Sequence, residues 1–203
     1  MKNKILVWDL PTRLFHWLLA TSFIGAYLTS ESERLRNIHV MLGYTLIGLI
    51  AFRLIWGFIG SRYARFSEFV RGPARVLEYM KSLLTTSPKH YIGHNPVGSV
   101  AVVLLLGLGV MTGLSGYLTY QEIGGDAFEE IHEIMANLMM TVVVAHVGGV
   151  IFSSRLHKEN LVKAMLDGQK EGPAAASIKK THPLVAILML FAVAAGWFFG
   201  LSG

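Results

Sequence analysis

Long runs of apolar residues constrain this chain more than any other feature of its sequence. A helix needs about 20 mostly apolar residues to cross the roughly 30 Å hydrocarbon core of a bilayer. Five segments meet this requirement, and the first, which contains Arg13 and His16, is the least hydrophobic of them. The predicted membrane spans cover residues 12–29, 38–59, 97–119, 130–152 and 183–201.

The composition agrees with a membrane protein and excludes several kinds of site. Of the 203 residues, 53% are hydrophobic and 15% are charged, whereas soluble domains carry about 25% charged residues. The chain has no cysteine, which excludes disulfides, thiolate zinc sites, iron–sulfur clusters and a covalently attached c-type haem. We therefore predict an all-α fold, an integral membrane helical bundle of four helices followed by a fifth, C-terminal transmembrane helix.

The basic residues predict how the spans are oriented. Fifteen of the 18 Lys and Arg residues lie in the N-terminal flank and in the loops after the second and fourth spans. Only Arg34 and Arg36 lie on the other side, and Arg53 lies within the second span. Because cytoplasmic loops carry the excess of Lys and Arg, we expect a cytoplasmic N-terminus and a C-terminus outside. The N-terminal segment is not expected to be a cleaved signal peptide, since Asp9, Pro11 and Arg13 interrupt its apolar region.

Three loops have distinct compositions. Residues 61–95 include a stretch with helical apolar spacing, which predicts a short helix at the cytoplasmic surface. Residues 168–182 are polar and rich in Gly, Pro and Ala, which predicts a flexible cytoplasmic linker between a first domain, 1–167, and the last helix, 183–203. The loop 120–130 is acidic and contains no Lys or Arg. It has either the ordinary charge of an outer loop or the charge of a docking patch for a basic partner.

Four of the eight histidines lie within predicted spans, at two matching depths. His16 and His146 fall in the cytoplasmic half of the membrane, and His39 and His132 fall in the outer half. One histidine in a helix is usually a hydrogen-bonded structural residue. Ionisable residues within a membrane are costly, however, and indicate a functional site.

The helical period places two of these histidines on one face. His132 and His146 are fourteen residues apart, which is within about 40° of four full turns and about 21 Å along the axis. One helix thus offers a ligand at each depth, and two other helices offer one ligand each. Facing imidazoles suit a six-coordinate haem iron. A zinc motif of the H-E-x-x-H kind is excluded, because residue 136 is Ala136.

Other residues are expected to accommodate the porphyrins. Arg13 on the inner side and Arg36 (or Arg34) on the outer side are candidates to bind propionates, although long basic side chains also extend to the interface without a specific partner. Small residues follow the histidines by about one turn and would leave room for a ring, although such residues also serve ordinary helix packing. These residues are Gly43, Ala136, Gly148 and Gly149.

Several motifs then occur in an order typical of one known family. They are V-W-D-L-P-T-R-L-F-H (7–16), R-L-I-W-G-F-I-G-S-R-Y-A-R-F (53–66), G-H-N-P-V-G (93–98), H-E-I-M-A-N (132–137), H-V-G-G-V (146–150) and S-S-R-L-H-K-E-N-L-V-K-A-M (153–165). With these motifs the sequence resembles the bacterial cytochrome b561 / nickel–iron hydrogenase b-type cytochrome family, over roughly residues 7–170. The resemblance implies two b haems with axial pairs His16/His146 and His39/His132. It also implies electron exchange between the quinone pool and a hydrogenase or a c-type cytochrome in the bacterial inner membrane.

The function expected from this resemblance is that of a di-haem electron-transfer subunit in a respiratory chain, with no catalytic side chain of its own. One alternative is a stand-alone superoxide:quinone or quinol oxidoreductase, although the four-helix branch of the family with that activity lacks a fifth span. Another is a membrane anchor or transporter without haem. A quinone site near the inner haem would use Arg53, Arg155 or His157, each of which also suits a plain place at the cytoplasmic interface.

Overall fold

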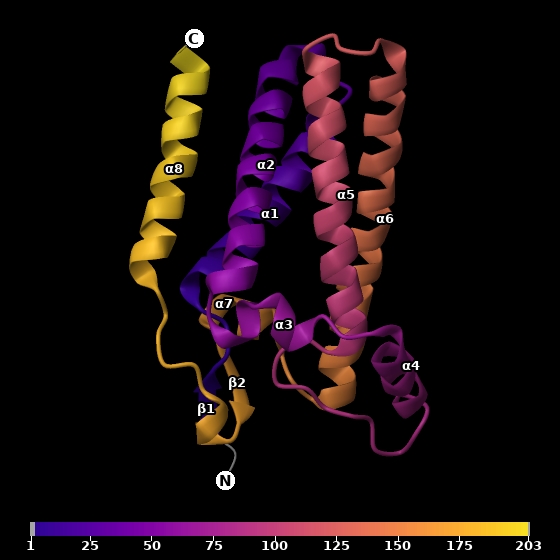
Figure 1. Ribbon diagram of the computed structural model, residues 1–203, viewed down its shortest axis with the longest axis vertical. Coiled ribbons are helices and arrows are strands. Elements are labelled where there is room, and N and C mark those ends of the chain that lie inside the picture. Colours follow the sequence, from indigo (N-terminus) through magenta and orange to yellow (C-terminus); the bar gives the residue numbers. More distant parts are fainter. Residues whose placement is uncertain (1–2, 203) are drawn as a thin grey trace.

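The structure is a computed structural model that describes residues 3–202, with side chains described for residues 3–200. Five long helices run side by side, and short elements gather at one end (Figure 1). The long helices are α1 (Leu10–Thr29), α2 (Arg36–Ile59), α5 (Pro96–Tyr120), α6 (Asp126–His157) and α8 (Pro183–Ser202). The short elements are α3 (Phe66–Phe69), α4 (Pro73–Ser82), α7 (Leu161–Asp167) and the strands β1 (Asn3–Leu6) and β2 (Gln169–Gly172). The predicted all-α membrane bundle is confirmed.

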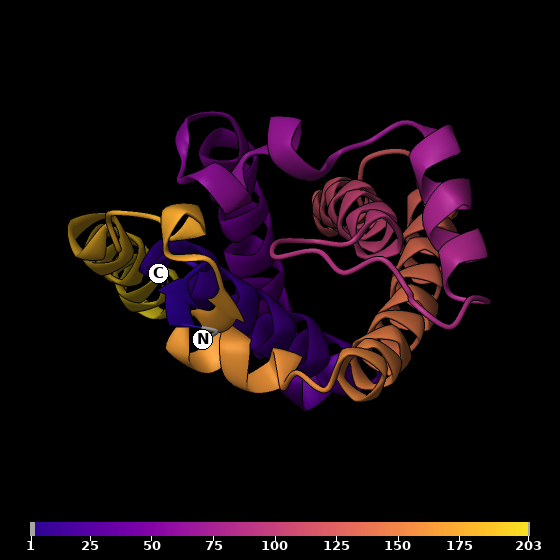
Figure 2. The same ribbon diagram turned by 90° about the horizontal axis from the view of Figure 1, so that it is seen from below.

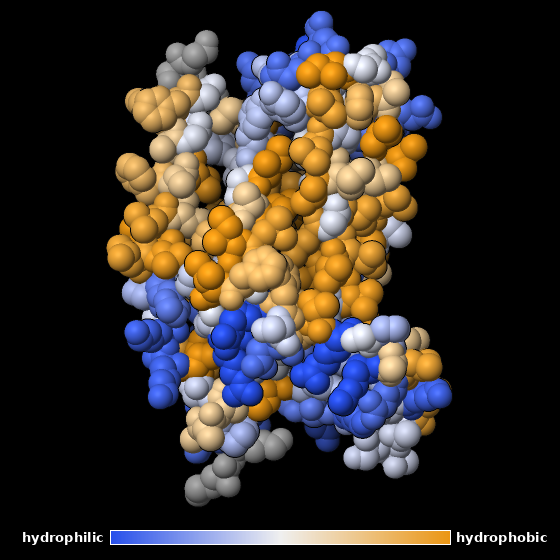
Figure 3. Space-filling view, in the orientation of Figure 1, coloured by the Kyte–Doolittle hydropathy of each residue, from blue (hydrophilic) through white to orange (hydrophobic). Residues whose placement is uncertain are grey.

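An apolar belt crosses the middle of the face shown in Figure 3. Apolar side chains cover the central part of the visible face, and polar ones gather at its two ends (Figure 3). Within the described residues, α2, α5, α6 and α8 are each long and apolar enough to cross a membrane. Helix α1 has 20 residues but is less hydrophobic, as the sequence predicted from Arg13 and His16. It runs beside α2, and β1 lies at the other end of the bundle from the C-terminal turns of α8 (Figure 1).

The start of α1 is fixed by a buried carboxylate. Asp9 is fully buried and caps the helix, because its side chain accepts a hydrogen bond from the backbone N–H of Thr12 at 2.8 Å. Its other oxygen accepts from the indole Nε1 of Trp56 on α2 at 3.0 Å. Such a cap stabilises a helix by about 1 kcal/mol. The segment V-W-D-L-P therefore begins α1 and joins it to the C-terminal end of α2.

Residues 168–182, predicted as a flexible linker, include the short strand β2. Strand β2 lies antiparallel to β1, with Leu6 opposite Gln169. Beyond the sheet, the backbone N–H of Leu10 donates to the carbonyl of Thr181 at 3.0 Å. Gly168 adopts a φ of +80°, and a Cβ there would lie 2.6 Å from the carbonyl oxygen of Trp8. The sequence did not predict this pairing because four-residue strands carry too little alternation to be recognised.

The short surface helix predicted in the 61–95 loop is confirmed as α4. Tyr79 and Ser82 face inward and are buried, whereas Leu77 and Met80 are more than half exposed. In the view from below, α4 lies at the edge of the bundle beside α5 and α6 (Figure 2). An exposed apolar side on such a helix suits the interface between lipid and water.

A continuous apolar core fills the middle of the bundle. It combines side chains from α1, α2, α5, α6 and α8, all with less than one tenth of their surface exposed. Met139, which is 2% exposed, lies about midway along α6 between His132 and His146. The residues of this core are Phe15, Phe23, Leu46, Leu49, Ile50, Leu106, Met139 and Met189.

Candidate functional site

The outer histidines face each other across the bundle. The ring centres of His39 on α2 and His132 on α6 lie 6.1 Å apart, with an angle of 81° between the ring planes. Two imidazole–metal bonds of about 2 Å each, plus about 1 Å from each nitrogen to its ring centre, give a spacing of roughly 6 Å. The pair therefore fits two axial ligands of one metal ion, as a six-coordinate haem iron requires.

Backbone carbonyls orient both outer rings. The Nδ1 of His39 donates to the carbonyl of Ala26 at 2.8 Å, and the Nδ1 of His132 donates to that of Thr112 at 2.9 Å. A carbonyl can only accept, so each neutral ring carries its proton on Nδ1. The Nε2 lone pair of each ring is then available for a metal, which is the usual arrangement around metal-binding histidines.

A glycine that the sequence did not single out makes room for one of these rings. A Cβ built on Gly116 of α5 would lie 2.7 Å from Cε1 of His132. Gly116 follows Thr112 by one turn, so this face of α5 supplies both the carbonyl and the space. Of the small residues predicted to leave room for a porphyrin, Gly43 and Gly149 both border open space, since an added Cβ there would meet nothing within 4 Å.

The inner histidines are arranged differently. His16 on α1 and His146 on α6 are each partly exposed and act on one another electrostatically, but no ring contact joins them within the described structure. The ring of His16 packs edge-on against Trp17 at 5.0 Å. Its Nδ1 is buried and has no hydrogen-bond partner among residues 3–200. His16 and His146 are thus predicted to lie at one level of the membrane. Within the described residues, they lack the hydrogen bonds to backbone carbonyls that orient the outer rings.

The two arginines predicted to bind propionates each lie about one helical turn before a histidine. Each is therefore nearer to the N-terminal end of its helix than the histidine is. Arg13 precedes His16 by three residues, and its Nη1 donates to the carbonyl of Leu166 at the end of α7. A cation at a helix C-terminus is favourable there. Arg36 precedes His39 by three residues and is exposed at the first position of α2. Their binding to propionates stays a prediction.

Comparison with known proteins agrees with this arrangement. Residues 7–168 match the family described as prokaryotic cytochrome b561. The chain belongs to that family. It is 31% identical to a probable Ni/Fe-hydrogenase B-type cytochrome subunit of Azotobacter vinelandii, over 64% of this chain and 65% of the relative. A protein of the same name from Azotobacter chroococcum mcd 1 is 33% identical, over 60% of this chain and 61% of the relative.

More distant relatives carry the same kind of name. A probable Ni/Fe-hydrogenase 1 B-type cytochrome subunit of Escherichia coli K12 is 26% identical, over 57% of this chain and 60% of the relative. The chain thus spans less than two thirds of the length of the Azotobacter relatives. No solved structure matches it significantly. Membership of the cytochrome b561 family implies a membrane protein that holds haem b.

Two polar side chains near the inner pair, Arg53 and His94, each have a buried nitrogen without a hydrogen-bond partner among the described residues. Arg53 is 3% exposed, and its guanidinium lies over the rings of Phe66 and Phe69, at 5.0 and 5.8 Å from their centres. The ring of His94 packs against Phe69 at 4.6 Å and Trp8 at 4.7 Å. Burial, and secondarily the charge of Arg53, lowers the pKa of His94 to about 3, so the ring is neutral at physiological pH. The sequence predicted His94 only as a peripheral loop residue.

The other candidates for a quinone site lie at or near a polar cluster at the end of α6. His157 packs against the ring of His90 at 5.1 Å. The carboxylate of Glu159 lies 3.0 Å from both Nε2 of His90 and Nζ of Lys170. Arg155 lies in the last turn of α6 nearby in sequence. This arrangement is typical of an ionic protein surface.

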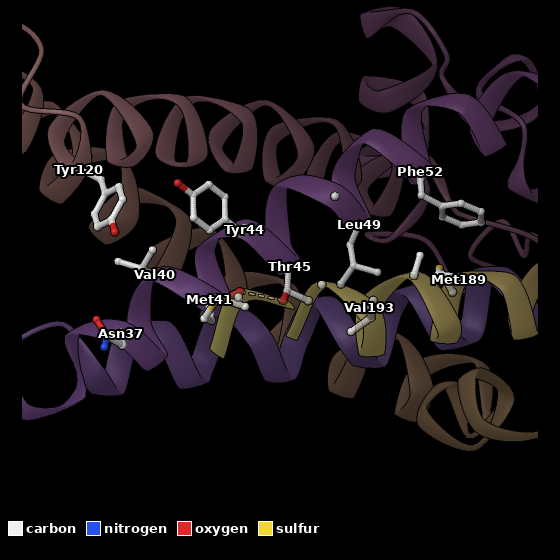
Figure 4. A pocket seen from close by; sticks show the side chains of 14 residues that line it. Asn37, Val40, Met41, Tyr44, Thr45, Leu49, Phe52, Tyr120, Met189 and Val193 are labelled. Carbon is white, nitrogen blue, oxygen red and sulfur yellow. Dashed lines mark hydrogen bonds between the residues drawn. The ribbon is translucent and has the colours of Figure 1, made fainter. Parts of the chain in front are cut away.

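A groove of about 500 Å³ separates α2 from α8. Figure 4 shows Tyr44 and Tyr120 toward its outer end and Phe52 and Met189 toward its inner end. Its lining residues on α2 follow a helical stripe that lies roughly opposite His39 on the same helix. Helix α8 also lies beyond residue 168, where the cytochrome b561 match ends. In the structure α8 therefore packs behind α2 and adds no side chain to the histidine pairs.

Proposed function

We propose that this chain is a membrane cytochrome b with two non-covalent haems, one held by His39 and His132 and one by His16 and His146. The proposal is carried by the 6.1 Å spacing of the outer rings and by the hydrogen bonds that leave both Nε2 atoms free. Residues 1–167 would form the haem-binding unit. Residues 168–182 would connect it to the C-terminal helix 183–203, whose role is packing.

When bound, each haem would accept and release one electron at a time. The protein's own part is to position the ligands and exclude water. His132 and His146 stand on one helix about 21 Å apart along its axis, and the apolar core that includes Met139 lies between these levels. Electrons would thus pass between the two sides of the membrane through a dry interior.

We further propose that a quinone is the reactant within the membrane and that a redox protein is the partner outside it. The names of the relatives favour a hydrogenase, and a periplasmic c-type cytochrome is the other candidate. The loop between α5 and α6 exposes Glu122, and the first turn of α6 exposes Asp126 and Glu129, which suits a basic partner. We place the chain in a bacterial inner membrane with a cytoplasmic N-terminus, because its basic residues gather at that end.

The alternative is an enzyme that oxidises quinol or superoxide without a partner. Purified protein in liposomes distinguishes the two functions. With a reduced quinone in the bilayer and an external electron acceptor, we expect the α-band of the b haems to appear and then decay as electrons reach the acceptor. If quinol reduces the haems only when both histidine pairs are intact, the result supports the electron-carrier function. Superoxide-driven quinone reduction by the isolated chain would favour the enzyme, and absence of any haem would exclude both.

A further inference from the structure

We infer that Arg53 and His94 together bind a propionate carboxylate of the inner haem. The inference rests on the proposed function, because it concerns a group that arrives with the cofactor. It assigns a ligand-binding role to two residues other than Arg13, the arginine that the sequence favoured for this side of the membrane.

The position of Arg53 on its helix is the first support. Arg53 follows His39 by fourteen residues, so it lies on nearly the same face of α2 and about 21 Å further toward the cytoplasm. His132 and His146 have the same spacing on α6. Helix α2 therefore presents a histidine to the outer level and an arginine to the inner level, where α1 supplies His16 instead.

The second support is that the buried guanidinium has unused donors. Arg53 is 3% exposed, and its Nη1 is buried without a hydrogen-bond partner in the described part of the chain. Asp9 attracts it electrostatically, but the two oxygens of Asp9 already accept from Thr12 and Trp56. A buried donor left unpaired costs about 1–3 kcal/mol, and more when it is charged. The site therefore favours an added acceptor.

The third support comes from His94, whose ring also packs against Phe69. His94 is partly exposed, but its Nδ1 is buried and also lacks a partner within residues 3–200. Both Arg53 and His94 touch the ring of Phe69, and His94 is coupled electrostatically to Arg53, His16 and His146. The two open donors thus lie in one cluster beside the inner histidines. A carboxylate can accept from both of them at once.

The charges of the cluster favour an anion over a neutral group. Arg53 carries a positive charge that only Asp9 attracts, and both oxygens of Asp9 already accept from other donors, while Lys170 is paired with Glu159 at 3.0 Å. A carboxylate would bond directly to the guanidinium, and hydrogen bonds between ionised partners are about twice as strong as neutral ones. A quinone carbonyl would satisfy a donor but would bring no negative charge. A haem propionate supplies both the acceptor and the charge.

The test combines a change in the protein with a change in the cofactor. Apoprotein of the wild type and of Arg53→Gln is reconstituted either with haem b or with haem whose propionates are methyl esters. Retention of each haem is measured by transfer to an excess of apomyoglobin, and the potentials are measured by redox titration. We expect Arg53→Gln to release the inner haem about 10–100 times faster while the outer haem is unaffected. Esterification should have the same effect in the wild type and little additional effect in the variant.

Three matched variants keep the result interpretable. Arg53→Lys retains the charge and should lie between the wild type and Arg53→Gln. His94→Gln keeps a donor of similar reach and should weaken retention less than His94→Leu. An unchanged spectrum of the outer haem reports that each variant has folded.

The outcomes separate the inference from the proposed function. If esterification and Arg53→Gln each speed release of the inner haem and their effects add, the inference is overturned. It is also overturned if Arg53→Gln retains both haems tightly and loses only quinol reduction. The latter result would assign Arg53 to the quinone. A wild-type protein without an inner haem would contradict the proposed function and the inference with it.

Discussion

The two histidine pairs of this cytochrome are positioned in different ways. The ring centres of His39 and His132 lie 6.1 Å apart. Each ring is held by a hydrogen bond to one backbone carbonyl, that of Ala26 for His39 and that of Thr112 for His132. At the inner level, His16 has a buried Nδ1 without a partner among the described residues. Buried charged groups surround that level instead, chiefly Asp9 and Arg53.

This difference indicates how the two sites would depend on their surroundings. The outer pair is oriented by helix backbone, so it should depend on close packing between α5 and α6. The inner pair is surrounded by side chains that lack partners, so it should depend on charges and on the cofactor itself. The apolar core between them, which includes Leu49 and Met139, should keep a change at one level from reaching the other.

The largest effect is expected from removing a ligand. His39→Ala should abolish the outer haem and leave the inner one, and His146→Ala should do the reverse, because each haem loses one of two axial ligands. Haem content per chain should fall from two to one in each variant, with a different α-band remaining. His90→Ala, at the cytoplasmic surface, is the control and should retain both. Loss of both haems in a single variant would show that the two levels are not independent.

A smaller but selective effect is expected at Gly116. In Gly116→Ala the new methyl group would lie 2.7 Å from the ring of His132, so the ring must move away from its carbonyl. We expect the outer haem to be held roughly 10–100 times less tightly and the inner haem to be unchanged. Gly107→Ala on the same helix borders open space and should be neutral or slightly stabilising. Equal behaviour of the two variants would contradict the close-packing account of the outer pair.

Asp9→Ala tests how far the inner level depends on buried charge. The change removes the cap of α1 and leaves both the indole N–H of Trp56 and the charge of Arg53 uncompensated. The free energy of unfolding should fall by about 3 kcal/mol, and the spectrum of the inner haem should change before that of the outer one. Thermal unfolding in detergent, followed at both haem bands, measures this order. A change that appears first in the outer haem would contradict the comparison.

The smallest effect is expected on α8, which contributes to neither pair. Trp197 donates from Nε1 to the hydroxyl of Thr45 on α2 at 2.9 Å. Trp197→Phe removes this bond and should lower the free energy of unfolding by about 1 kcal/mol, with both haem spectra intact. Phe191→Leu, at a side chain that is 73% exposed, is the matched control. A spectral change in Trp197→Phe would give α8 a role beyond packing.

The sequence predicted the features that depend on local period and composition. Apolar runs long enough to span a membrane predicted the long helices. The fourteen-residue spacing of His132 and His146 predicted that histidines lie at two levels of the bundle. The pairing of β1 with β2 was missed, because it joins segments more than 160 residues apart that carry no strand pattern of their own.

The parts of the site that were missed depend on contacts between distant segments. The ring of His94 packs against Trp8 and Phe69 and its Nδ1 is buried, and nothing in G-H-N-P-V-G itself indicates that. The role of Gly116 follows from the approach of α6 to α5. A glycine within an apolar span is equally typical of ordinary helix packing.

The number of haems per chain tests the central claim most directly. Protein purified from membranes in mild detergent should contain two b-type haems per polypeptide, by pyridine haemochrome absorbance against amino-acid analysis, and a redox titration should resolve two one-electron steps. One haem per chain, or none, in protein whose four span histidines are intact would contradict the account.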